Sequence, residues 1–159
     1  MAQKNSVALL TFDTAIEELF ERFPALRAAY RAKTLSMGQD SPSASIVFHS
    51  VLLPFLESAL ERGDLGVILR VCAYLEDAAE GATADPRLQN LIRTDFGEWL
   101  GTTEQEDRLS PWLGSETKRI CGYVPGLATQ RKALKLEKEQ NRWGRRIAAR
   151  FKKWWSGVK

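Results

Sequence analysis

The chain has 159 residues, of which 44% are hydrophobic and 27% charged, a composition typical of a soluble globular protein with one independent core. No apolar run approaches the ~18 residues of a membrane-spanning helix. The formal net charge of +3 conceals an asymmetry: residues 130–159 hold eleven Lys or Arg and two Glu, and the rest of the chain has six more acids than bases. The pI of the whole chain therefore says little about the partners of its body.

The chain opens with a predicted helix over residues 12–23, where apolar side chains recur with a helical period. Pro24 disfavours the α conformation of the residue before it, so we expect this helix to break or kink at Phe23. The apolar stripe then continues to about Lys33. The turn-forming residues 36–45 predict a loop.

Residues 46–53 are ambiguous, because their apolar run also fits a buried strand. Pro54 counts against a smooth helix, since proline removes one hydrogen bond and its ring clashes with the carbonyl of Ser50. The apolar residues nevertheless keep a helical period across the proline. We therefore favour a kinked helix that ends at Gly63.

The next two helices have clearer boundaries. Asp64 is a predicted cap for residues 65–81, which Gly81 closes; the apolar stripe of this helix is Leu65, Ile68, Leu69, Cys72, Leu75 and Ala79. Asp85-Pro86 is a cap followed by proline at the first helical position, and it predicts a helix that runs to Gly101.

The last third contains a short helical turn at residues 102–109, a helix that Ser115 can cap, and a stop at Pro125-Gly126. A long helix can follow from residue 127 to about 156. We expect an all-α fold, a bundle or short solenoid-like stack of six or seven antiparallel helices, with a body at residues 1–126 and a basic amphipathic C-terminal helix at residues 127–159.

Four stretches resemble a family of small, mostly uncharacterised bacterial α-helical proteins. They are LLPFLESAL, ILRVCAYLEDAA, LQNLIRTDFGEWL and LGSETKRIC, and the similarity covers about residues 45–121. Its pattern consists of packing residues and turns, not of catalytic groups, and does not extend to residues 127–159. Some members resemble immunity proteins encoded beside bacterial toxins, so the resemblance implies a toxin as the partner.

No set of residues indicates a reaction centre. His49 is the one imidazole and lies on an apolar segment, and Cys72 and Cys121 lack the spacing of a metal site. No phosphate-binding loop, dinucleotide motif or HExxH motif is present. We therefore predict no catalytic, cofactor-binding or metal-binding residues and no enzymatic activity.

Acidic residues crowd the body, where they are either an ordinary solvated surface or a surface that attracts a basic active site. Under the second interpretation, aromatic side chains such as Trp154 act as anchors among them. The residues predicted to bind a partner are Glu57, Glu61, Asp64, Glu76, Asp77, Asp95, Glu98, Trp99 and Trp112.

The C-terminal helix combines an apolar stripe with six cations and no acid between residues 142 and 155. It can lie on an anionic membrane, bind nucleic acid, or dock on the acidic body or in a groove of a partner; we favour docking. The residues for membrane or nucleic-acid binding are Arg142, Trp143, Arg145, Arg146, Arg150, Lys152, Lys153, Trp154 and Trp155.

These observations lead to one functional hypothesis and one alternative. The hypothesis is a non-enzymatic immunity-type protein that neutralises a cognate bacterial toxin by steric and electrostatic blockade. The alternative is an adaptor that binds an anionic membrane surface or nucleic acid through its C-terminal helix. We expect a cytoplasmic location, because residues 1–15 are a poor signal peptide.

Overall fold

The fold is all-α, as predicted. The computed structural model describes the backbone of residues 9–37 and 43–156 and the side chains of residues 9–35 and 43–142. These residues contain no strand, so residues 46–53 are helical and the strand alternative for them is wrong.

Eight continuous helical stretches make up the described residues, where the sequence predicted six or seven. Two of these stretches contain a π-helical segment, labelled η. In chain order, the elements are α1 (Phe12–Arg22), α2 (Pro24–Met37), the run α3 (Ala44–Val47), η1 (Phe48–Leu52) and α4 (Leu53–Arg62), then α5 (Leu65–Gly81), the run α6 (Pro86–Leu91), η2 (Ile92–Phe96) and α7 (Gly97–Leu100), and finally α8 (Glu106–Leu109), α9 (Ser115–Cys121) and α10 (Leu127–Ser156).

Proline residues shape the first half of the chain in two ways. Phe23 separates α1 from α2, and Pro24 begins α2, which confirms the predicted break. α2 continues to Met37, beyond the predicted end near Lys33. Pro54 instead lies inside a continuous helix, as the second residue of α4 and two positions after η1 ends. The wider turns of η1 precede the proline, which has no N–H to donate to the helix.

The stretch Ala44–Arg62 is long and apolar enough to cross a membrane by composition, yet it is a core helix of the body. Its side chains Phe48, Leu52, Leu56 and Leu60 are fully buried. It ends at Gly63, whose left-handed backbone (φ 67°) closes the helix as predicted.

The core is centred on α5, which packs against α4, α6 and α9. Tyr74 of α5 is completely buried, and its hydroxyl donates a 2.9 Å hydrogen bond to the backbone carbonyl of Ala15 in α1. Ile68, Cys72, Leu75 and Ala79 are buried as predicted, but Leu65 and Leu69 remain 45% and 42% exposed. The side chains of Val71, Tyr74 and Ala78 are buried instead, on one side of the predicted apolar stripe. The sequence alone did not indicate on which side of the stripe the neighbouring helices would pack.

Gly81 does not have the left-handed backbone of a typical closing glycine. The residues before α1 cross α5 here, and a Cβ at position 81 would lie 2.0 Å from the carbonyl oxygen of Leu10. Glycine is therefore required by the close approach of two backbones and not by the turn itself.

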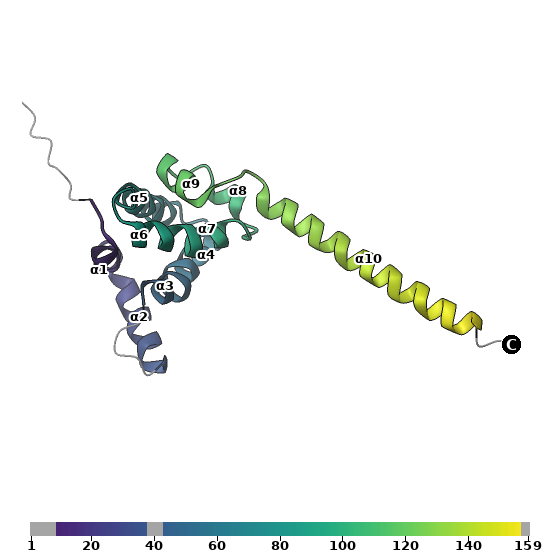
Figure 1. Cartoon of the computed structure of the whole chain (residues 1–159). Coiled ribbons are helices and arrows are strands. Elements are labelled where there is room, and N and C mark those ends of the chain that lie inside the picture. Colours follow the sequence, from purple (N-terminus) through teal and green to yellow (C-terminus); the bar gives the residue numbers. More distant parts are fainter. Residues whose placement is uncertain (1–8, 38–42, 157–159) are drawn as a thin grey trace, which may run out of the picture.

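The helix α10 extends away from the body formed by α1 to α9 (Figure 1). Ala128 is buried at its base, whereas every residue from 129 to 142 is exposed. Arg131 and Lys132 contact the loop that follows α7, and the described side chains of residues 133–142 stay exposed. The favoured docking site on the chain's own body is not observed for them.

We expect the substitution Gly81→Ala to lower the free energy of unfolding strongly, because the new methyl group displaces the backbone of Leu10. The control is Gly66→Ala in the same helix, where the nearest atom to the new Cβ is a side-chain oxygen of Asp64 at 3.6 Å. That change should be neutral or stabilising by up to ~1 kcal/mol. Urea denaturation of both variants measures the difference, and equal stabilities would contradict the proposed backbone crossing.

Candidate interaction surface

Glu76 of α5 caps the N-terminus of α9, a role that the sequence did not reveal. Its carboxylate accepts hydrogen bonds from the backbone N–H groups of Glu116 and Thr117, both at 2.9 Å, and from the Thr117 hydroxyl at 2.8 Å. The first N–H groups of a helix have no partner within the helix, so an acceptor supplied by another helix satisfies them. Glu76 thereby joins α5 to α9.

Gly114, not the predicted Ser115, precedes the first residue of α9. A Cβ at position 114 would lie 2.0 Å from the carboxyl carbon of Glu76. Because Gly114 has no side chain, the carboxylate of Glu76 can occupy this space. Burial raises the pKa of Glu76, whereas the hydrogen bonds from Thr117 and Glu116 lower it. The hydrogen bonds outweigh burial, so the pKa lies below the ordinary 4.5.

Asp85 makes a second connection of this kind. It caps α6 as predicted, accepting from the N–H of Arg87 at 3.0 Å and of Leu88 at 3.4 Å, and its other oxygen accepts from the N–H of Phe12 at 2.8 Å. The hydrogen bond from Phe12 is the main reason why the pKa of Asp85 lies below its usual 3.8. The start of α1 is thereby tied to the start of α6.

Glu106 of α8 makes a third connection, at the base of α10. This buried carboxylate accepts from the hydroxyl of Tyr123 and from the N–H of Gly126, both at 2.8 Å. Gly126 immediately precedes α10. We call Glu76, Asp85 and Glu106 the carboxylate caps, because each accepts a backbone N–H from a different segment of the chain.

His49 and Asp95 form the closest approach to a catalytic arrangement. The Nε2 atom of His49 lies 2.7 Å from Oδ1 of Asp95, and the hydroxyl of Ser45 donates to the same oxygen at 2.7 Å. The carboxylate thus lies between serine and histidine. A nucleophilic triad needs the histidine in the middle, so this cluster does not activate Ser45. It links α3 and η1 to η2.

Most acids predicted to bind a partner are engaged within the body. Besides Glu76 and Asp95, Glu57 accepts from the indole N–H of Trp99 at 2.7 Å, so these two candidates pair with each other. Asp77 pairs with Arg22 at 2.6 Å. Asp64 caps α5 through the N–H of Val67, as the sequence predicted.

Three of the predicted residues remain available to a partner: Glu61, Glu98 and Trp112. Trp112, between α8 and α9, is 42% exposed. The structure does not gather the nine predicted residues into one surface, because they are spread from α4 to the segment before α9. An acidic residue that bonds an N–H from a distant segment cannot be told from a free surface acid in the sequence.

The second candidate surface is α10. Arg142 is exposed, and the backbone is helical through Ser156. The side chains of the other candidates lie outside the described residues; these candidates are Trp143, Arg145, Arg146, Arg150, Lys152, Lys153, Trp154 and Trp155. Leu134 and Leu136 are 57% and 51% exposed, so apolar surface on this helix faces solvent.

Among the described side chains, no three His, Cys, Asp or Glu residues come close enough to hold a metal ion. Burial raises the pKa of the Cys72 and Cys121 thiols to about 12, which suppresses the reactive thiolate. The described residues thus provide neither a metal-binding cluster nor an activated thiol.

Residues 16–125, more than half of the chain, match a domain family of unknown function, DUF7674. The chain belongs to this family. The match begins within α1 and stops before α10, which starts at Leu127. No curated protein and no solved structure is significantly similar to the chain. DUF7674 membership carries no functional name, so the resemblance to toxin-immunity proteins stays a prediction.

We expect Glu76→Gln to destabilise the protein by about 1–3 kcal/mol at pH 7, because an amide presents an NH2 group to one of the N–H donors that the carboxylate satisfied. The pKa of Glu76 is lowered in the folded state, so its contribution is present above the unfolded pKa and is lost as the pH falls through the folded pKa. The difference in unfolding free energy between the original protein and the variant should therefore shrink below about pH 4.5.

The control for this prediction is Glu80→Gln, which changes an exposed carboxylate one turn further along α5. Urea denaturation between pH 7 and pH 3 measures both variants. The loss of unfolding free energy in Glu76→Gln should depend on pH and should be absent from Glu80→Gln. A loss that does not change with pH, or an equal loss in Glu80→Gln, would show that the Glu76 carboxylate does not act as a cap.

Proposed function

We propose that this protein is a non-catalytic binding protein that attaches to an anionic membrane surface through the basic, amphipathic second half of α10. One observation carries the proposal. α10 leaves the body with residues 129–142 exposed (Figure 1). It continues as helix through a segment, residues 142–155, that contains six cations and no acid.

The sequence of α10 fits a helix that lies flat on a membrane. On a helix, one apolar face is formed by Leu136, Trp143, Ile147, Phe151 and Trp154. The cations fall on the flanks and the opposite face. Such a helix buries its apolar face about 5–10 Å into the boundary between headgroups and acyl chains, while its cations meet lipid phosphates.

The length of the segment agrees with this orientation. Fifteen helical residues, 142–156, extend about 22 Å, which is shorter than the ~30 Å hydrocarbon core. Six cations within that length also oppose insertion across the membrane. A helix that lies in the plane of the surface avoids both costs.

Two other partners for α10 fit less well. Self-pairing as a coiled coil would place Thr129, Gln140 and Arg150 in a regular heptad core, where polar side chains destabilise the pair. Nucleic acid would bind the cations, but Ile147 and Phe151 on a continuous apolar face would gain little from a phosphate backbone. A lipid surface can contact the apolar face and the cations of α10 at the same time.

The test compares binding of the full-length protein to vesicles of phosphatidylcholine with 30% phosphatidylglycerol and to vesicles of phosphatidylcholine alone, by co-sedimentation. We expect binding only to the anionic vesicles, with a steep loss at high salt. Ile147→Gln combined with Phe151→Gln should weaken binding about tenfold or more, because each buried apolar side chain contributes roughly 1.5–3 kcal/mol.

The matched control is Ala149→Gln, which by helical periodicity changes the cationic face of the same segment. It should bind like the original protein. Equal binding of the apolar-face variant would contradict the proposal. Retention of an oligonucleotide without any vesicle binding would favour the nucleic-acid alternative.

Toxin immunity is the second candidate function, and the exposure of Trp112, Glu61 and Glu98 favours it. A half-exposed tryptophan is the type of side chain that anchors protein interfaces. The proposed mechanism is steric and electrostatic blockade of a toxin encoded by a neighbouring gene.

Removal of residues 130–159 separates the two functions. Under the immunity hypothesis the body makes the interface, so co-expression with the neighbouring toxin should still protect cells, and Trp112→Ala in the full chain should reduce protection. Under the membrane proposal the same truncation abolishes vesicle binding. Loss of protection on truncation, with no effect of Trp112→Ala, would contradict an interface on the body.

A further inference from the structure

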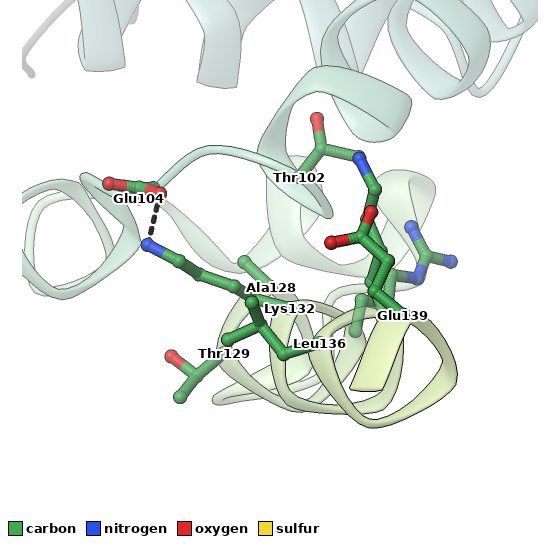
Figure 2. Close-up of a pocket in the computed structure, with 9 residues that line it drawn as sticks. Thr102, Glu104, Ala128, Thr129, Lys132, Leu136 and Glu139 are labelled. Carbon is green, nitrogen blue, oxygen red and sulfur yellow. Dashed lines mark hydrogen bonds and ion pairs between the residues drawn. The ribbon is translucent and has the colours of Figure 1, made fainter. Parts of the chain in front are cut away.

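A cleft of about 670 Å³ lies at the base of α10, between its first turns and the loop that follows α7. Thr102 and Glu104 form the loop wall, and Ala128, Lys132 and Leu136 lie on the helix wall (Figure 2). The carboxylate cap of Glu106 on Gly126 fixes the turn from which α10 starts. The cleft is therefore built on an anchored part of the helix.

The cations of the cleft are not equivalent. Lys132 forms an ion pair with Glu104, shown as the dashed line in Figure 2. Arg131 donates one N–H to the carbonyl of Gly101 at 3.1 Å, which holds its guanidinium at the cleft and leaves other N–H groups for a ligand. Lys135 also lines the cleft, and it pairs with no described side chain. The carboxylate of Glu139, one turn beyond Lys135, also lines the cleft (Figure 2), and it forms no ion pair with a described side chain. The lining therefore holds three cations and two carboxylates, and Arg131 and Lys135 are the two cations left to meet a phosphate.

An apolar wall lies beside this charge. Leu136 lines the cleft, is 51% exposed, and by helical periodicity begins the apolar face that continues to Ile147 and Trp154. A ligand whose phosphate meets Arg131 and Lys135 can therefore rest an attached apolar chain on Leu136. A free phosphate would leave that wall unused.

We propose that this cleft binds the headgroup phosphate of one anionic phospholipid, whose acyl chain lies along Leu136 toward the membrane-facing side of α10. The inference rests on the proposed membrane function and adds a site for a single lipid at the junction of body and helix. The apolar face of residues 143–154 supplies attachment to the surface, whereas Arg131 and Lys135 select the phosphate.

The probe is dihexanoyl phosphatidylglycerol below its micelle concentration, titrated into the full-length protein by calorimetry, with inorganic phosphate as the second ligand. We expect saturable binding of the lipid and binding of phosphate at least tenfold weaker. Lys135→Gln should weaken lipid binding about tenfold, since the variant loses a charge-assisted hydrogen bond to the phosphate. Arg131→Gln should act in the same direction.

Lys138→Gln is the matched control, because Lys138 is on the same helix and does not line the cleft. Lys135 makes no contact that folding requires, so its variant tests the site without loss of structure. Ile147→Gln with Phe151→Gln should weaken vesicle binding about tenfold or more and leave binding of the monomeric lipid intact. This variant separates failure of the cleft from failure of the membrane proposal. Unchanged lipid binding in Lys135→Gln, or equal affinity for phosphate and lipid, would overturn the inference.

Discussion

Carboxylates that accept backbone N–H groups from distant segments hold this helical body together. The first turns of α6 and α9 contain N–H groups without a partner in their own helix, and each buried donor that stays unpaired costs free energy. Glu76, Asp85 and Glu106 each satisfy such a donor. Among the described residues, no buried side-chain nitrogen or oxygen lacks a hydrogen-bond partner.

This use of the acids changes what the charge of the protein means. An acidic body beside a basic C-terminal segment suggests a body that attracts a basic partner or its own tail. In the structure, the carboxylates of Glu57, Asp77 and Asp95 bind Trp99, Arg22 and His49, so these three acids are engaged within the body. Among the described cations of α10, Lys132 pairs with Glu104 and Arg131 with the carbonyl of Gly101, and the helix then leaves the body (Figure 1).

The arrangement divides the molecule into a packed body and a projecting helix. The family match covers most of the body and ends before α10, so the projecting helix lies outside the matched region. Glu106 and Arg131 attach its first turns to the body through Gly126 and Gly101. An isolated amphipathic helix in water gains little from its apolar face, which is the physical reason to look for a surface that covers it.

Local sequence determined the all-α class and most helix boundaries. Pro24, Gly63, Asp64 and Asp85-Pro86 act on the backbone within a few residues, so their effects on helix starts and ends are readable without the fold. Only the tertiary structure decided that Gly81 admits the backbone of Leu10, that Gly114 admits the Glu76 carboxylate, and that Leu65 and Leu69 stay exposed. These features depend on contacts between residues tens of positions apart, and no local pattern specifies which segments will meet.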